Sequence, residues 1–329
     1  MSKIRAAITA VEGYVPDYIL TNDELSKMMD TSDEWIMTRI GIKERRMLKE
    51  EGKATSDMAA IAVQNLLKNN NIDPKDIDGV ICCTVTPDMH FPATASIVAD
   101  KCGIHGGMSM DMNVGCSGFI YGLKTASLYI ESGFCKKLLL IGAEKMTSAI
   151  DYQDRATAPI FGDGAAVVLL EPTEEEVGVM DAILCSDGVG RKHLHMKAGG
   201  SLKPASHETV DAREHFVYQE GQAVFKWAVS KMADVSVEIM ERNNLSADTI
   251  SYLLPHQANI RIINAVGHRM ELPEEKVLVN IEKFGNTTSA TIPLLMWENQ
   301  HKFKKGDNLI LTSFGAGFSW GAIYVKWAI

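Results

Sequence analysis

Three residues in this sequence could carry covalent chemistry, and each stands beside a turn signal or at the end of an apolar run. Cys116 lies in "DMNVGCSGF", His256 in "LLPHQAN" and Asn286 in "KFGNTTS". A cysteine thiolate is a nucleophile, an imidazole exchanges protons, and a side-chain amide donates hydrogen bonds. Each also has a structural interpretation: a buried core cysteine, a histidine satisfied by its neighbours, and an asparagine in a Gly-Asn turn or at a helix N-cap.

Cys116 is placed where a predicted strand, 108–114, turns into a predicted helix, 117–132. The apolar spacing of that helix indicates a buried element, and Gly118 and Gly122 would let it pack closely against a neighbour. Free N–H groups at a helix N-terminus stabilise negative charge. We therefore expect a thiol pKa below the usual range for cysteine, with backbone N–H groups able to hold an oxyanion beside the sulfur.

His256 comes directly after an apolar segment, 250–255, which predicts a position at the carboxyl end of a strand. Ligands of open α/β sheets bind at that edge. The glycine-rich segment "SFGAGFSWGA", 313–322, also follows a strand-like run. It lacks the Gly-Lys-Ser/Thr ending of a phosphate-binding loop, so it predicts a tight buried turn that offers backbone N–H groups.

The segment "DTSDEWIMTRIGI" predicts a short helix that begins at a Thr31/Glu34 capping box and ends at Gly41. Trp35 and Arg39 are four residues apart and therefore share one face of that helix. Such a pair could hold a planar aromatic ring by stacking and cation–π attraction. An ordinary surface pair of tryptophan and arginine is the alternative.

The elements that must position these residues follow an α/β pattern, because short apolar runs alternate with stretches of helical period. The predicted strands are 79–85, 108–114, 137–143, 165–171, 179–186, 250–255 and 308–314, and the predicted helices include 56–70, 221–243 and 259–270. The pattern "KLLLIGAE…FGDGAAVVLLEP" is similar to "NLILTSFGAG…WGAIYVKWA", which fits either a duplicated unit or the general likeness of buried strands. The acidic turn 171–178 is a candidate boundary, and the polar segment 187–215 is long enough to be a binding flap.

Bulk composition disfavours several classes of protein. The chain has 329 residues, 46% of them hydrophobic, and a net charge of -9, which works against binding to nucleic acid or anionic membranes. No run approaches the ~18 apolar residues of a membrane span, and residues 1–17 lack the apolar core of a signal peptide. Six cysteines without a CxxC motif predict reduced thiols in a cytoplasm. Nine histidines without paired ligand spacing give no support for a metal site.

Taken together, six segments resemble, in order, the β-ketoacyl-acyl-carrier-protein synthase III family of thiolase-fold condensing enzymes. They are "SDEWIMTRIGIKERR", "DMNVGCSGF", "DRATAPIFGDGAAVVLL", "LLPHQANIRII", "KFGNTTSATIP" and "FGAGFSWGA". The resemblance runs nearly end to end. It implies two duplicated βαβαβαββ halves, residues 1–172 with the nucleophile and residues 173–329 with the histidine and asparagine, in a five-layered α-β-α-β-α core. It also implies a homodimer.

The resemblance further implies roles for single residues. Cys116 would be the nucleophile with His256 and Asn286 as its partners, and the backbone N–H groups of Cys116 and Ala316 would form the oxyanion hole. Ala316 stands where the family often has glycine, a change that leaves the backbone donor in place. The implied binding residues are Trp35, Arg39 and Arg155 for coenzyme A, Arg261 and Arg269 for the carrier protein or pantetheine arm, and Phe91 and Phe314 for the acyl pocket, with Phe91 reaching the pocket of the partner subunit.

The implied reaction is a decarboxylative Claisen condensation that initiates type II fatty acid biosynthesis. The Cys116 thiolate would take the acyl group of an acyl-CoA, such as acetyl-CoA, and release coenzyme A. His256 and Asn286 would then donate hydrogen bonds to the thioester carbonyl of malonyl-acyl-carrier protein and stabilise the enolate left by loss of CO2. Attack of that carbon on the acyl-cysteine gives 3-ketoacyl-acyl-carrier protein. No cofactor is implied, and the basic face of helix 259–270 is the expected docking surface for an acidic carrier protein.

Relatives and rivals differ in a few residues. Thiolases use a second cysteine and elongating synthases a second histidine at the position of Asn286, and no general-base glutamate of the HMG-CoA synthase kind can be placed. A secondary-metabolite condensing enzyme of the same fold is the nearest alternative. A papain-like thioester hydrolase also uses cysteine, histidine and asparagine, but its Cys-Gly-Ser-Cys-Trp signature is missing. A silent subunit of a polyketide system would lack Cys116.

Overall fold

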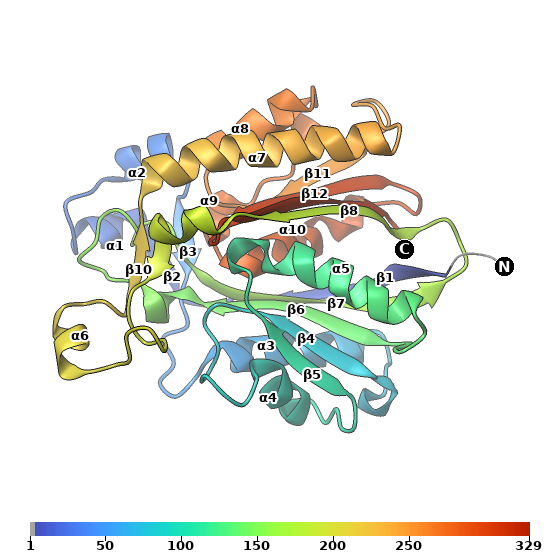
Figure 1. The fold of residues 1–329 in the computed structure, drawn as a ribbon, viewed down its shortest axis with the longest axis horizontal. Helices are drawn as coiled ribbons and strands as arrows, with labels where there is room; N and C mark the ends of the chain where they lie inside the picture. The colour runs from blue at the N-terminus through green and yellow to red at the C-terminus, as the bar shows by residue number, and fades with distance from the viewer. Residues whose placement is uncertain (1–3) are drawn as a thin grey trace.

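Residues 4–329 are described by a computed structural model, in which helices and strands alternate in five layers (Figure 1). The helices of these layers are α3 (Thr55–Asn69) and α4 (Thr94–Lys101) on one outside, α5 (Gly118–Glu131) and α10 (Thr291–Asn299) in the middle, and α7 (Gly221–Arg242) and α8 (Ile260–Arg269) on the other outside. One sheet lies on each side of the middle layer. The predicted α-β-α-β-α core is therefore confirmed.

The first sheet is built from the N-terminal half and has the strand order β1-β7-β6-β4-β5. Its strands are β1 (Arg5–Tyr14), β4 (Gly79–Cys83), β5 (Met108–Met112), β6 (Leu138–Lys145) and β7 (Asp163–Thr173). β4 is parallel to both of its neighbours, whereas β7 is antiparallel to β1 and to β6. β6 is buried along nearly its whole length because helices cover both faces of the sheet, which explains its uninterrupted apolar sequence.

The second sheet repeats this arrangement with one strand missing. Its order is β11-β12-β13-β8, and its strands are β8 (Gly178–Ser186), β11 (Tyr252–Pro255), β12 (Asn308–Gly315) and β13 (Ser319–Lys326). The position beside β11, which corresponds to that of β5 in the first sheet, holds only a single parallel bridge between Leu253 and Val277. The βαβαβαββ pattern thus holds in full for the first half only, but the shared order and strand directions support the predicted duplication. The predicted boundary between residues 172 and 173 falls at the end of β7.

Two predicted strands end earlier than their apolar sequence suggests. β4 ends at Cys83, not at residue 85, because the N–H groups of Val85 and Thr86 turn away from the sheet and donate to the carboxylate of Glu144. β5 ends at Met112 instead of residue 114, just before the corner that holds Cys116. In both cases the chain leaves the sheet where it begins to build the cavity described below.

The predicted capping box at the start of α2 (Asp33–Arg39) is wrong by one residue. The N-cap is Ser32, whose hydroxyl accepts the N–H of Trp35 at 3.1 Å. Thr31 cannot take that place because its own N–H is bonded to the carbonyl of Met29, which holds it in the preceding turn. The predicted end of the helix is correct, since Gly41 has the positive φ of +84° that glycine favours.

The segment predicted as a flap, 187–215, is not a simple loop. It contains β9 (Leu194–Met196), which pairs antiparallel with β10 (Val217–Gln219), and the short helix α6 (His207–Asp211). Figure 1 shows α6 projecting from the body of the molecule beyond this hairpin. The remaining short elements are the paired strands β2 (Ile19–Thr21) and β3 (Glu44–Arg46) and the helices α1 (Asn22–Ser26) and α9 (Ile281–Phe284).

Candidate active site

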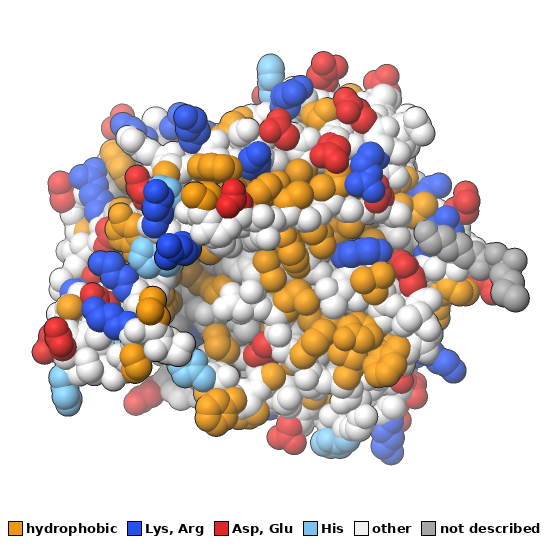
Figure 2. Space-filling model, in the orientation of Figure 1, with side chains coloured by type: hydrophobic (Ala, Val, Ile, Leu, Met, Phe, Trp, Pro, Cys, Tyr) orange, Lys and Arg blue, Asp and Glu red, His pale blue; other side chains and the backbone are white. Residues whose placement is uncertain are grey.

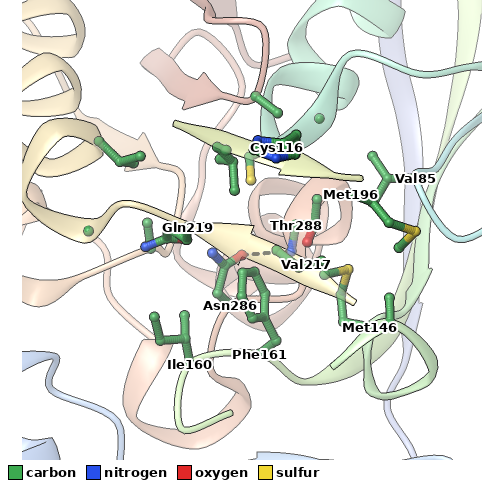
Figure 3. Close-up of a pocket in the computed structure, with 18 of the residues that line it drawn as sticks. Val85, Cys116, Met146, Ile160, Phe161, Met196, Val217, Gln219, Asn286 and Thr288 are labelled. Carbon is green, nitrogen blue, oxygen red and sulfur yellow. Dashed lines mark hydrogen bonds between the residues drawn. The ribbon is translucent and has the colours of Figure 1, made fainter. Parts of the chain in front are cut away.

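A cavity of about 1400 Å³ brings Cys116, His256 and Asn286 together, although they come from three distant segments of the sequence. The β9–β10 hairpin forms part of its wall, so the predicted role of 187–215 as a binding flap agrees with its position. Figure 3 shows Cys116, Asn286 and Thr288 among the residues that face this space. The geometry around each of the three predicted residues defines what chemistry the cavity can perform.

Cys116 lies in a 3-10 turn, Gly115–Ser117, that leads directly into α5. The turn packs tightly against the β12–β13 connection, because a Cβ on Gly315 would lie 2.6 Å from the Cys116 nitrogen. Likewise, a Cβ on Gly115 would lie 2.8 Å from the Ala316 nitrogen. Only glycine fits at these two positions, and the fit brings the N–H groups of Cys116 and Ala316 to the same corner, as an oxyanion hole requires.

The expected low pKa of the Cys116 thiol is wrong for this structure. Burial, and after it the carboxylate of Glu144, raise the pKa of the thiol, whereas the Cys116 N–H and the side chains of Asn286 and Thr288 lower it; the net value is about 12. The side chain faces the cavity and is only half-buried, yet protein surrounds the sulfur closely enough for desolvation to dominate. The helix N-terminus therefore does not decide the charge of the thiol, and the resting group is neutral at physiological pH.

His256 follows β11, as predicted, and its backbone N–H donates to the carbonyl of Thr312 in the neighbouring strand at 2.8 Å. The imidazole is buried, and burial lowers its pKa to about 3, so the ring is neutral. Nδ1 lies 2.7 Å from the hydroxyl oxygen of Thr291, while Nε2 has no partner in the described chain. The free Nε2 is the atom of this histidine that is available to a substrate.

Asn286 is fixed through its backbone and leaves one end of its amide free. Its backbone N–H donates to the carbonyl of Ile160, and its backbone carbonyl accepts the N–H of Gly162. Its side-chain oxygen accepts the N–H of Thr288 at 2.8 Å, the bond drawn in Figure 3. The NH2 end of the amide stabilises the thiolate form of Cys116, which is the behaviour of a hydrogen-bond donor directed at the sulfur.

Two residues of the site were not predicted. Thr288 lines the cavity beside Asn286, and Glu144 lies behind it, fully buried at the end of β6. The Glu144 carboxylate accepts hydrogen bonds from Val85 and Thr86 and from the hydroxyl of Ser289, and burial raises its pKa to about 7. A charged residue that ends an apolar strand was a visible signal for Glu144, but nothing in the sequence distinguishes Thr288 from the hydroxyl residues beside it.

The three residues predicted to bind coenzyme A all line the cavity, but their pairing differs from the sequence-based expectation. The guanidinium that lies over the ring of Trp35, 4.7 Å from its centroid, belongs to Arg155 and not to Arg39. Sharing a helix face brings Arg39 near Trp35, but Arg155 approaches from a separate loop and reaches the face of the ring. A planar group entering here would meet Trp35 and Arg155 together.

The other predicted binding residues are distributed over the cavity and its surroundings. Arg261 lines the cavity with its guanidinium 5.0 Å from the ring centroid of Phe225, and Phe314 is a buried part of the lining. Arg269 is exposed at the end of α8 and Phe91 is 83% exposed, and both lie outside the lining of this cavity.

Within residues 4–329, no group of three or more histidine, cysteine, aspartate or glutamate side chains is arranged to hold a metal ion. No helix in the same range has the length and apolar character needed to cross a membrane. All six cysteines are free thiols.

The family models and the most similar relatives indicate one family. Two family models match this chain: "3-Oxoacyl-[acyl-carrier-protein (ACP)] synthase III" over residues 110–188 and its "C terminal" counterpart over residues 240–327. The β-ketoacyl-[acyl-carrier-protein] synthase III of Porphyromonas gingivalis (strain W83) is 61% identical over 328 residues, covering 100% of this chain and 98% of the relative. The synthase III 2 of Bacteroides thetaiotaomicron is 59% identical over 327 residues, covering 99% of this chain and 98% of the relative. The crystal structure of 3-oxoacyl-[acyl-carrier-protein] synthase III from Aquifex aeolicus has a TM-score of 0.90 and 38% identity, covering 98% of this chain and 100% of that chain.

Proposed function

The chain belongs to the β-ketoacyl-[acyl-carrier-protein] synthase III family, and from this premise we propose that it condenses an acyl-CoA primer with malonyl-acyl-carrier protein. The products are 3-ketoacyl-acyl-carrier protein, coenzyme A and CO2, and the reaction initiates fatty acid biosynthesis. The observation that carries the proposal is the shared cavity of Cys116, His256 and Asn286, in which Nε2 of His256 has no hydrogen-bond partner among the described residues and the Asn286 amide is directed at the sulfur. The family predicted from the six sequence segments is confirmed.

In the first step Cys116 receives the acyl group. Its thiolate attacks the thioester carbonyl, the carbonyl oxygen becomes negative, and the N–H groups of Cys116 and Ala316 stabilise that charge. The thiolate forms from a buried neutral thiol, so the donors around the sulfur control how much of it is present. Coenzyme A leaves as a thiolate and takes up a proton.

In the second step His256 and Asn286 act on malonyl-acyl-carrier protein. The hydroxyl of Thr291 lies 2.7 Å from Nδ1 of His256 and 3.1 Å from the carbonyl of Thr288, so we assign its proton to the shorter contact. Nδ1 then accepts, and the ring hydrogen of the neutral imidazole lies on Nε2. Nε2–H and the Asn286 amide both donate to the malonyl thioester carbonyl as CO2 departs. The enolate carbon then attacks the acyl group on Cys116; the new C–C bond forms, the C–S bond to the cysteine breaks, and Cys116 leaves as a thiolate that takes up a proton.

Binding of the two substrates follows from the edges of the cavity. Trp35 and the Arg155 guanidinium that lies 4.7 Å from its ring centroid offer the adenine of coenzyme A a stacking and cation–π surface, and Arg39 contributes a further positive charge to the cavity lining. The exposed face of α8 carries Arg261, His268 and Arg269, which gives an acidic carrier protein a basic surface on a chain of net charge -9.

A second copy of this chain completes the assembly in our proposal. β5 is an edge strand of the first sheet, so one side of its backbone has no partner strand within the described residues. Figure 2 shows hydrophobic side chains gathered over α5 and β5. Leu128 in α5 and Phe134 just after that helix are exposed, and so is Phe91 in the connection between β4 and α4. Pairing of two β5 edges would bury this surface and bring Phe91 to the partner's acyl pocket. Sedimentation at micromolar concentration is expected to give a dimer.

The organisation and location of the enzyme complete the proposal. Residues 1–172 and 173–329 are two copies of one unit, each supplying part of the catalytic set at the carboxyl ends of its strands. Residues 1–3 lie outside the described part of the chain. Six free thiols suit a reducing cytoplasm.

The test is a product assay with a panel of acyl-CoA primers and malonyl-acyl-carrier protein. We expect 3-ketoacyl-acyl-carrier protein and CO2 to form in equal amounts, dependent on both substrates. Release of free acid from acyl-CoA without a ketoacyl product would contradict the proposal and favour a thioester hydrolase.

A further inference from the structure

Three residues that line the cavity carry a buried polar side-chain atom without a hydrogen-bond partner in the described chain: His195, His256 and Thr288. Buried polar atoms are almost always paired, so each exception needs an explanation. For His256 the explanation is the proposed reaction, in which Nε2 donates to the malonyl thioester carbonyl. His195 is only half-buried, at the flap. Thr288 is 3% exposed and has no assigned role, and Figure 3 shows its side chain near Cys116 and Asn286.

The backbone of Thr288 is also unusual. Five residues other than glycine have a positive φ within residues 4–329, and four of them, Asn71, Arg213, Asn244 and Glu271, lie just after the end of a helix. That position commonly adopts the left-handed conformation. Thr288, with φ of +52°, is the exception and is β-branched, the type of side chain that disfavours this conformation most. Such strain is retained where the surroundings fix it, which occurs often at functional sites.

The turn holds the backbone N–H and the backbone carbonyl of Thr288 in fixed directions. Its N–H donates to the side-chain oxygen of Asn286 at 2.8 Å, and its carbonyl lies 3.1 Å from the hydroxyl of Thr291. With the backbone held in this way, the hydroxyl is left without an acceptor other than a group inside the cavity. Cys116 lines the same cavity, and Figure 3 shows its sulfur near the Thr288 side chain.

We propose that the Thr288 hydroxyl is a catalytic hydrogen-bond donor to the sulfur of Cys116, stabilising the thiolate that attacks the acyl-CoA. The proposal rests on the proposed function for the identity of the nucleophile. No new covalent step is involved, since the hydroxyl keeps its proton and donates to a thiolate lone pair.

The electrostatics around the sulfur agree with this assignment. Burial and then the charge of Glu144 raise the pKa of the Cys116 thiol, and Cys82 and Cys83 are neutral thiols whose pKa values burial also raises. The groups that oppose this are the Cys116 N–H, the Asn286 amide and the Thr288 hydroxyl. Without a cationic partner in that set, neutral donors carry the stabilisation of the thiolate, and removal of one is measurable.

The first experiment measures the rate at which iodoacetamide alkylates Cys116 between pH 7 and 9, followed by peptide mass spectrometry. Thr288→Val keeps the shape and removes the hydroxyl, and Thr288→Ser keeps the hydroxyl. Loss of the donor is expected to slow alkylation at least about three- to fourfold, because a rise of one pKa unit cuts the thiolate fraction tenfold while greater basicity partly compensates. Thr288→Ser should stay within about twofold of the unchanged protein.

A second variant, Thr288→Ala, keeps the test valid if the Thr288→Val protein does not fold. It removes the hydroxyl and the β-branching together, and it should slow alkylation to the same extent. Alkylation of both hydroxyl-free variants at the rate of the unchanged protein would overturn the proposal. Iodoacetamide requires no substrate, so this result stands or fails independently of the condensation reaction.

The second experiment separates a donor to sulfur from a residue that only positions Asn286. In a Cys116→Ala background, decarboxylation of malonyl-acyl-carrier protein depends on His256 and Asn286 but has no sulfur to stabilise. Adding Thr288→Val should leave that rate within about twofold. A fall as large as that caused by Asn286→Ala would show that Thr288 acts through Asn286, and would overturn the assignment.

Discussion

Cys116 from the N-terminal half and His256 from the C-terminal half face one cavity, and burial moves their pKa values in opposite directions. The thiol rises to about 12 and the imidazole falls to about 3, so both groups are neutral before substrate arrives. Their surroundings differ, however. Three donors lower the pKa of the thiol and the buried Glu144 carboxylate raises it, whereas Nδ1 of His256 meets only the Thr291 hydroxyl. The cysteine is therefore poised to become charged transiently, and the histidine to act as a neutral donor.

The largest expected effect comes from removing the sulfur itself. Cys116→Ala should abolish formation of the acyl-enzyme and lower condensation by roughly 10³-fold or more, because no other group can hold the acyl chain. Decarboxylation of malonyl-acyl-carrier protein should remain detectable, since it depends on the other half of the site. Radiolabelled CO2 release and protein acylation, measured in parallel, check both statements. Acylation of the Cys116→Ala protein would contradict the assignment of Cys116 as the residue that receives the acyl group.

The complementary change is made on the C-terminal half. His256→Ala or Asn286→Ala should reduce malonyl decarboxylation about 10²–10³-fold, the usual cost of one missing oxyanion donor. The two variants should differ in acylation: His256→Ala leaves it nearly unchanged, and Asn286→Ala slows it severalfold because the amide also stabilises the thiolate. Single-turnover acylation measured for each variant makes the distinction. Equal acylation rates would remove Asn286 from the set of sulfur donors.

The dependence of thiol reactivity on pH tests the neutral resting state. Because the folded pKa of Cys116 lies above the ordinary value, the thiolate fraction grows about tenfold per pH unit throughout the range 7–10. Alkylation by iodoacetamide should rise with nearly that slope and show no plateau. A plateau that begins near pH 7 would instead indicate the low pKa that the helix N-terminus suggested.

The smallest effect is expected from the charge of Glu144. In Glu144→Gln the new oxygen can keep the bonds from Val85 and Thr86, while the new NH2 donates to Ser289, whose hydroxyl can donate to the carbonyl of Cys83 at 2.6 Å. The geometry is thus retained and only the charge is lost. Cys116 alkylation above pH 7 should become about three- to fourfold faster, because a nearby negative charge no longer opposes the thiolate.

A matched control for Glu144→Gln is Glu174→Gln, in the turn between β7 and β8 and outside the lining of the cavity, which should leave the alkylation rate unchanged. Glu144→Ala removes the charge and the hydrogen bonds together, so its thermal unfolding reports the structural part. An unaltered alkylation rate in Glu144→Gln would show that the carboxylate does not influence the sulfur.

Much of the fold could be predicted because it depends on local patterns. The uninterrupted apolar run of β6 requires cover on both faces, and the spacing after Cys116 predicts α5 with Gly118 and Gly122 in close packing. A Cβ on Gly122 would indeed lie 2.5 Å from the sulfur of Cys83. Cys116, His256 and Asn286 could be selected because six segments resemble one family in order, whereas each motif alone also had a structural interpretation.

What could not be predicted depends on contacts between distant segments. The pKa of Cys116 is set by the packing of the β12–β13 connection and the Asn286 turn around the sulfur, not by its place before α5. Arg155 displaces Arg39 as the partner of Trp35 because it approaches from another loop. The left-handed backbone of Thr288 has no sequence signature, since glycine or asparagine is the usual occupant of that conformation.

The most direct test of the central claim is the intact mass of the protein after incubation with acetyl-CoA, followed by peptide mapping. We predict one acetyl group per chain, located on the peptide that contains Cys116 and lost when malonyl-acyl-carrier protein is added. The same protein carrying Thr288→Val should reach that state more slowly, and His256→Ala should reach it but retain the acetyl group after the carrier is added. Acetylation on any other residue, or an acetyl group that does not respond to malonyl-acyl-carrier protein in the unchanged protein, would contradict the account.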